Sequence, residues 1–180
     1  MPRKLLILIH MYVAAFLAPA LILVGLSGGF YLSGYGGETT KISVSLPADT
    51  VLDFKAPELD ANVRTLLKDH DPNYSFEKIE SRGPRIQTYP KSRPYYEFEI
   101  KNGKLSATHH KPNFQAVMME LHKGHGTNLF KIYQKFVALG LLLIVLSGIS
   151  VGLGSKVYRR KTIATTASGL LVFILLGFVF

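Results

Sequence analysis

The chain has 180 residues, of which 48% are hydrophobic and only 18% charged, and its formal net charge is +9. This apolar composition argues against a purely soluble protein. Because the chain has no cysteine, disulfides, thiolate metal sites, cysteine nucleophiles and covalently attached c-type haem are excluded.

The charged residues are segregated along the chain. All twelve acidic residues fall between Glu38 and Glu120. The polar segment from Gly34 to Lys135 holds fifteen Lys and Arg against these twelve acids, a net charge of +3. The other six basic residues flank apolar tracts, which is typical of a membrane topology signal. We therefore predict no nucleic-acid partner.

The first apolar tract predicts a transmembrane helix over residues 5–33. It carries no charge, and about 20 apolar residues suffice to cross a bilayer. A signal peptide is the competing interpretation, because Arg3 and Lys4 form a basic start and Ala18-Pro19-Ala20 resembles a cleavage site. The apolar region of a signal peptide is only about 7 to 15 residues long, so a membrane anchor is favoured.

Two further spans are predicted over residues 128–154 and 162–180, each just long enough to cross. Residues 155–161 between them form a predicted basic loop with four cations, Lys156, Arg159, Arg160 and Lys161. The positive-inside rule places this loop and the N-terminus on the cytoplasmic side. Residues 34–127 are then expected outside the cytoplasm.

The segment 34–127 has the pattern of a small α+β domain. Alternating apolar residues predict a half-buried strand at Ile42, Val44 and Leu46. Apolar residues at helical spacing then predict an amphipathic helix, which Asp71-Pro72-Asn73 ends; they are Leu59, Val63, Leu66 and Leu67.

A hairpin is predicted further along. Tyr96, Phe98 and Ile100 alternate with charged residues up to Asn102-Gly103, a pair that favours a two-residue turn, and residues 104–110 return as the partner strand. Residues 114–122 have a helical pattern that ends before two glycines, Gly124 and Gly126. Three prolines predict an irregular loop or an edge segment before the hairpin, namely Pro84, Pro90 and Pro94.

Three stretches together resemble the PepSY domain and the PepSY-associated transmembrane helix family. They are ILIHMYVAAFLAPALILVGLSGGF, the hairpin PYYEFEIKNGKLSATHH, and LHKGHG followed by VALGLLLIVLSGISVGL. Larger members have two PepSY units and four or more spans, whereas this chain has room for one unit and three spans. The resemblance therefore implies an α+β membrane protein with three transmembrane helices. A small extracytoplasmic domain, a helix plus an antiparallel sheet, would be inserted between helices 1 and 2.

Histidines are the candidate ligands of this cysteine-free chain, because neutral imidazoles suit zinc, copper and haem iron. Candidate cofactor ligands, with haem b as the candidate group, are His10, His122 and His125, and candidate metal ligands are His109, His110, His122 and His125. The spacing of His122 and His125 could place both on one helix face.

A structural interpretation competes at each histidine. His10 could be a neutral imidazole hydrogen-bonded to a neighbouring helix or to Tyr158, and residues 148–161 at its depth contain no partner histidine for a haem. His122 and His125, with Lys123, could instead lie against lipid headgroups.

No catalytic motif is present: the chain lacks a zincin H-E-x-x-H, a G-x-S-x-G and a phosphate-binding glycine loop. The glycines of GLSGG and LSGISVGLG are better explained by close helix packing. Enzymatic activity is therefore not indicated.

Two functions follow from the resemblance. The first is a non-enzymatic protein of the bacterial inner membrane whose outside PepSY-like domain binds or regulates a protein partner, as an accessory subunit of a larger assembly. The alternative is a haem-binding electron-transfer subunit linked to iron or siderophore reduction. The expected partners are membrane lipids and another membrane or periplasmic protein, or a second copy of the chain.

Overall fold

A computed structural model describes residues 3–47, 50–101 and 103–179. Asn102 of the predicted turn and Phe180 at the end of the predicted third span lie outside the described residues. The chain divides into two compact units. We call residues 23–134 the sheet unit, and the described part of residues 1–22 and 135–180 the helical unit.

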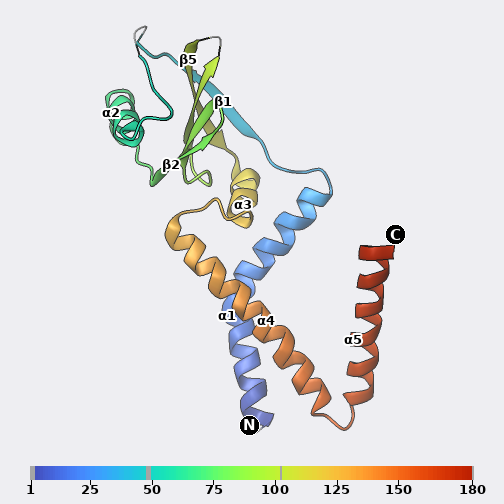
Figure 1. Ribbon diagram of the computed structural model, residues 1–180. Helices are drawn as coiled ribbons and strands as arrows, with labels where there is room; N and C mark the ends of the chain where they lie inside the picture. The colour runs from blue at the N-terminus through green and yellow to red at the C-terminus, as the bar shows by residue number, and fades with distance from the viewer. Residues whose placement is uncertain (1–2, 48–49, 102, 180) are drawn as a thin grey trace. The chain divides into compact units, whose positions relative to one another are not determined.

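Three helices are long and apolar enough to cross a membrane, as predicted (Figure 1). They are α1 (Arg3–Leu32), α4 (Asn128–Leu153) and α5 (Arg159–Ile174), which continues as a π-helical turn over Leu175–Val179. An α-helix satisfies every internal backbone hydrogen bond within the segment, which a lipid environment requires. The chain therefore has the architecture of a multi-pass membrane protein.

The connection between α4 and α5 is shorter than predicted. The Arg159 N–H donates to the Ser155 carbonyl oxygen at 2.9 Å, and the Thr162 N–H donates to that of Tyr158 at 2.8 Å. Arg159, Arg160 and Lys161 therefore lie in the first turn of α5, within the segment 155–161 for which the sequence predicts a loop. Helical bonding near a membrane satisfies the backbone, while long cationic side chains still reach the polar headgroups.

The sheet unit contains a five-stranded antiparallel sheet in the order β1-β5-β4-β3-β2. Its strands are β1 (Thr39–Val44), β2 (Lys78–Arg82), β3 (Arg85–Tyr89), β4 (Tyr95–Lys101) and β5 (Lys104–Pro112). Two shorter helices, α2 (Leu59–His70) and α3 (Phe114–His122), belong to the same unit.

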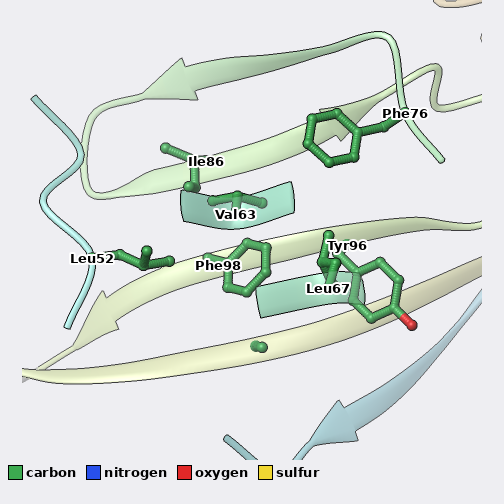
Figure 2. Packing of buried hydrophobic residues seen from close by; sticks show 8 residues of the cluster. Leu52, Val63, Leu67, Phe76, Ile86, Tyr96 and Phe98 are labelled. Carbon is green, nitrogen blue, oxygen red and sulfur yellow. The ribbon is translucent and has the colours of Figure 1, made fainter. Parts of the chain in front are cut away.

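Helix α2 packs on one face of this sheet. Figure 2 shows Val63 and Leu67 of α2 facing Ile86, Tyr96 and Phe98 of the strands, all of them buried. The predicted alternation in β4 is thereby confirmed at Tyr96 and Phe98, whereas the third apolar residue, Ile100, is 39% exposed. Each fully buried side chain of this size contributes roughly 1.5–3 kcal/mol by leaving water, so this cluster is the main stabilising element of the sheet unit.

The first strand is only partly covered. Val44 and Leu46 pack against the core, but Ile42 is 43% exposed. The predicted half-buried strand is therefore present over Thr39–Val44, with its first apolar residue outside the core.

The proline-rich stretch was wrongly predicted to be irregular or an edge. Strand β3 is an inner strand that pairs with β2 on one side and β4 on the other. Pro84 lies in the turn before β3, after Gly83 with φ +61°, and Pro90 and Pro94 lie in the connection that follows. A proline withdraws only its own N–H, so prolines just outside a strand leave its pairing intact.

Helix α3 has the predicted bounds. Its N-cap is Asn113, whose Oδ1 accepts a hydrogen bond from the Ala116 N–H at 2.9 Å. Beyond His122, Gly124 adopts φ +79°, the left-handed conformation that commonly ends a helix.

Candidate functional site

His10 bonds to a second membrane helix within the helical unit. Its Nδ1 lies 2.8 Å from the Ser147 Oγ, so α1 and α4 are joined by a polar contact. The Ser147 hydroxyl itself donates to the Ile144 carbonyl oxygen at 3.1 Å. A Cβ on Gly148 would lie 3.3 Å from the His10 ring, so the glycine lets the imidazole approach α4 closely.

His122 makes the same kind of contact within the sheet unit. Its Nδ1 lies 2.7 Å from the Oγ of Ser27 near the end of α1, and that hydroxyl donates to the Val24 carbonyl oxygen at 3.1 Å. Gly28 lies against the His122 ring, where a Cβ would be 3.5 Å from Cε1.

In both contacts the serine hydroxyl lies within hydrogen-bond distance of the histidine Nδ1 and of a carbonyl oxygen of its own helix. A neutral imidazole that carries its proton on Nδ1 would satisfy both contacts, and its Nε2 would then keep the lone pair that binds a metal.

A repeated tripeptide supplies both serines. Leu26-Ser27-Gly28 lies near the end of α1, and Leu146-Ser147-Gly148 lies near the end of α4. Sequence reasoning assigned these glycines to helix packing but missed that a histidine contacts each Ser-Gly pair. The available signal was the arrangement itself, with a histidine at the head of the first apolar run, another before the second, and a Leu-Ser-Gly near the end of each.

His109 and His110 lie on opposite faces of the sheet. His109 stacks on Tyr96 with ring centroids 4.3 Å apart, on the face that α2 covers, and His110 stacks on Tyr95 at 4.7 Å on the other. Successive strand residues point in opposite directions, so these two imidazoles cannot bind one ion together.

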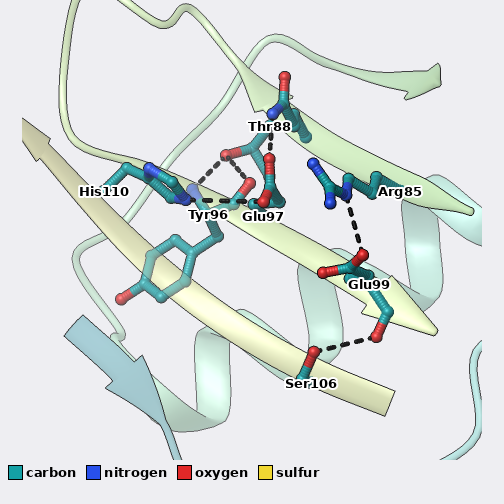
Figure 3. A network of polar contacts seen from close by, with 8 residues as sticks. Arg85, Thr88, Tyr96, Glu97, Glu99, Ser106 and His110 are labelled. Carbon is teal, nitrogen blue, oxygen red and sulfur yellow. Dashed lines mark hydrogen bonds and ion pairs between the residues drawn. The ribbon is translucent and has the colours of Figure 1, made fainter. Parts of the chain in front are cut away.

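The rings of His109 and His110 are both closely packed against neighbouring side chains. Neither Nε2 has a hydrogen-bond partner among the described residues, although the His110 Nε2 lies 3.9 Å from a Glu97 carboxylate oxygen. Figure 3 shows the His110–Glu97 pair. The Gln87 side-chain amide donates to the other carboxylate oxygen of Glu97. Burial lowers the pKa of both histidines; Lys111 lowers that of His109 further, while Glu97 partly offsets the shift of His110. Glu97 is thus a half-buried partner and not a freely solvated side chain.

The loop that follows α3 contacts the end of strand β3 and the residues just after it. The His125 Nδ1 lies 2.5 Å from a carboxylate oxygen of Glu120, and the His125 carbonyl accepts the Lys91 N–H at 3.1 Å. The His125 ring meets the Tyr89 ring edge-on at 5.7 Å. His125 therefore fixes the loop to the sheet through contacts within the unit.

Lys91 is the most unusual cation of the sheet unit, because only 7% of it is exposed. Its ammonium lies 5.6 Å from the centre of the Tyr89 ring, and Lys78 and Lys131 lie at 4.9 and 5.2 Å from the same centre. Burial lowers the pKa of Lys91 and raises that of Tyr89 to about 12. The ring faces provide the cation–π attraction that accommodates these charges.

The predicted ligands do not meet as a set. His122 contacts Ser27, His125 contacts Glu120, and His109 and His110 face apart. Among the described residues no group of three or more His, Asp or Glu side chains could hold a metal ion.

The sheet has two edge strands, β1 and β2, and the edge at β1 lies beside an apolar side chain and a cavity. Within the part of the chain that the structure describes, β5 is the only strand paired with β1, and Ile42 stands opposite His109. His109 in turn lines a cavity of about 340 Å³ with Tyr74, Arg93 and other residues of the two loops 71–75 and 93–94. An open edge, an exposed apolar side chain and a cavity with a cation are therefore adjacent.

A comparison with protein-family models, curated proteins and solved structures gives no match to this chain. The resemblance to the PepSY family remains a prediction from the residues that carry it.

Proposed function

We propose that this chain is a non-enzymatic membrane protein whose sheet unit binds a protein partner, as an accessory or regulatory subunit. Its support is the combination of three membrane-type helices with a small domain that exposes a sheet edge. The partner is another membrane or periplasmic protein.

The proposal includes an orientation in the bacterial inner membrane. Arg3, Lys4 and the four cations around the α4–α5 connection belong on the cytoplasmic side by the positive-inside rule. The sheet unit then lies on the opposite, periplasmic side, where it meets proteins outside the cytoplasm.

The single observation that carries the binding role is the open edge at β1. Unpaired N–H and C=O groups of an edge strand pair readily with an extended segment of another protein, and nearby cavities then select side chains. Ile42 supplies an apolar contact at this edge, and the cavity lined by His109 and Arg93 lies beside its cross-strand neighbour. The edge therefore provides both affinity and selectivity.

Photo-crosslinking of the full chain in native membranes tests this role. A photoreactive amino acid at Thr40, on the same strand face as Ile42, should give an adduct with another protein, whereas one at Ser106 on inner strand β5 should not. A second copy carrying a different tag separates adducts with the chain itself from adducts with a partner.

The matched variants are Ile42→Asp and Ile100→Asp, because Ile100 is similarly exposed at 39% but lies on β4. We expect Ile42→Asp to reduce the Thr40 adduct about tenfold and Ile100→Asp to leave it unchanged. Equal adducts at both crosslinking positions, or equal effects of both variants, would show that β1 is not the docking site.

The second candidate is a haem-dependent electron-transfer subunit, favoured by His10 and His122, which each place an imidazole against a Ser-Gly pair of a membrane-type helix. His10 is the only histidine of residues 1–22 and 135–180, and the cavity beside it is about 200 Å³. Small-molecule sites usually measure about 300–1,000 Å³, so a haem with two histidine ligands does not fit the helical unit of a single chain. A haem would need a second subunit.

An absorption spectrum separates the two candidates. We expect no Soret band from tightly bound haem in the purified chain. Stoichiometric haem that disappears in His10→Ala or His122→Ala would overturn the non-redox proposal.

A further inference from the structure

An apolar groove lies beside the C-terminal end of α1. It has a volume of about 440 Å³ and is lined by Leu26, Phe30, Tyr35, Phe114, Gln115 and Met118. These residues come from the last turns of α1, the linker that follows, and the first turns of α3, all within the sheet unit. We call it the α1–α3 groove.

The walls of the groove are fixed by backbone contacts. The Tyr35 N–H donates to the Phe30 carbonyl oxygen at 2.8 Å, and the Gln115 side-chain amide donates to the Tyr35 carbonyl oxygen at 2.8 Å. Gly37, at φ +82°, lies so close to the backbone of Ala116 that any Cβ there would clash. The linker is thereby held against α3, and the groove is built into the fold.

The level of the groove on α1 points to lipid. Helix α1 has 30 residues, about 45 Å at 1.5 Å per residue, whereas the hydrocarbon core is about 30 Å thick. If a crossing of about 20 residues begins at Leu5, the first residue after the basic start, it ends near Val24, and Leu26 and Phe30 would then lie at the edge of the core. Phe114, on the opposite wall, is 78% exposed. The groove is therefore apolar at a level where acyl chains and headgroups meet.

The chemistry of the walls favours an acyl chain over a peptide. The Gln115 side-chain amide nitrogen already donates a hydrogen bond to the Tyr35 carbonyl oxygen of the linker. The other side chains of the walls are apolar or, at Tyr35, carry a single hydroxyl. An extended peptide would leave backbone groups unpaired there. Met118 adds an adaptable thioether surface that suits a flexible chain.

The charge of the chain segment that contains α3 selects the headgroup. Within the sheet unit, the stretch from Lys111 to Lys131 carries three lysines against the single acid Glu120, which pairs with Lys123 at 3.5 Å. Such a surplus attracts anionic lipid headgroups. We propose that the α1–α3 groove binds an acyl chain of an anionic phospholipid drawn from the surrounding bilayer.

Fluorescence quenching tests the proposal with the full chain in vesicles, because the sequence contains no tryptophan. Phe114→Trp places a reporter at the groove, and Phe173→Trp, at an exposed position on α5, reports ordinary lipid around the helices. The vesicles are phosphatidylcholine with increasing amounts of phosphatidylglycerol that carries a brominated acyl chain.

We expect quenching at position 114 to be half-maximal at a fraction of brominated phosphatidylglycerol about fivefold lower than at position 173. A difference of this size is the effect of one lysine near an anionic headgroup. Brominated phosphatidylcholine should give no such difference. Groove-filling Leu26→Phe should raise the fraction required at position 114 to that at position 173, and the control Leu142→Phe, at an exposed position on α4, should not.

Two results would overturn the proposal. Identical quenching curves at the two positions would mean ordinary bilayer contact, and no quenching at position 114 would mean that protein fills the groove. A second variant, Lys111→Gln, is exposed and outside the groove, so it tests the charge argument without altering packing. It should weaken quenching by brominated phosphatidylglycerol and leave that by phosphatidylcholine unchanged; equal behaviour of both lipids would refute the headgroup selection.

Discussion

Neighbouring side chains of β4 contribute unequally to the stability of the sheet unit. Phe98 is completely buried beneath α2, so its truncation leaves a cavity. Glu99, its neighbour on the other face, pairs with Arg85 at 3.0 Å in a partly solvated position. Adjacent residues on one strand therefore have unequal energetic roles.

Phe98→Ala should lower the free energy of unfolding of the sheet unit by about 3–5 kcal/mol, from lost burial and the residual cavity. Glu99→Gln should cost less than about 1 kcal/mol, because exposed ion pairs contribute little. Proteolysis at increasing urea concentrations measures both. Similar losses for the two variants would mean that β4 does not present Phe98 to the core.

The stacked histidines should make the sheet unit sensitive to acid. Burial lowers the pKa of His109 and His110 in the folded state. At mildly acidic pH the unfolded chain therefore binds more protons at these imidazoles than the folded chain does. Stability is then present above the unfolded-state pKa of about 6.5 and is lost as the pH falls through it towards the lowered folded-state pKa.

We expect lower protease resistance at about pH 5 than at about pH 7.5. A His109→Phe, His110→Phe double variant keeps aromatic stacking without a titrating ring, so its resistance should change less over this range. An unchanged pH response in the double variant would assign the effect to other groups.

At the scale of elements, short polar contacts hold the membrane helices at defined positions. The His10–Ser147 bond joins α1 to α4, and Gly140 lies so close to Leu17 that a Cβ there would clash with the leucine side chain. Helices in lipid associate through such close packing and interhelical hydrogen bonds, since lipid chains are as apolar as the helices themselves.

Ser147→Ala should weaken this helix pair by about 0.6–1.7 kcal/mol, the measured range for interhelical hydrogen bonds in a membrane protein. Ser150→Ala is the matched control, because the Ser150 hydroxyl donates only to the Leu146 carbonyl oxygen of its own helix. Unfolding of the full chain in SDS, followed by circular dichroism, measures both variants. An equal effect of Ser150→Ala would show that the His10 contact does not stabilise the pair.

At the scale of the whole molecule, the orientation in the membrane depends on a few cations. Six of them flank the apolar helices at Arg3, Lys4, Lys156, Arg159, Arg160 and Lys161. The sheet unit and the α4–α5 connection should therefore lie on opposite sides of the bilayer.

Single cysteines in this cysteine-free chain test that orientation. Arg93→Cys should react with an impermeant maleimide in intact cells whose outer barrier has been opened, whereas Lys156→Cys should react only after lysis. Lys91 would be a poor labelling position because it is buried. The opposite pattern would invert the proposed orientation.

Local periodicity was enough to predict much of the fold. Uncharged runs predicted the three long helices, and alternation predicted the hairpin and the buried Tyr96 and Phe98, because these patterns follow from the geometry of a single element. Once residues 104–110 are predicted to form a strand, it also follows that His109 and His110 point to opposite faces of the sheet, because successive strand residues alternate. Prolines misled the prediction for β3 because their effect depends on whether they lie inside a strand or just beyond its ends.

The sequence by itself therefore determined the spans, the charge asymmetry and the strand alternation. Only the tertiary structure decided that His10 meets Ser147 and His122 meets Ser27, across 137 and 95 residues of chain. It also decided that β1 lies at the sheet edge and that Lys91 is buried. The physical reason is that hydrophobic periodicity shows which face of a helix or strand is apolar. Which other segment packs against that face depends on tertiary contacts between residues far apart in the sequence.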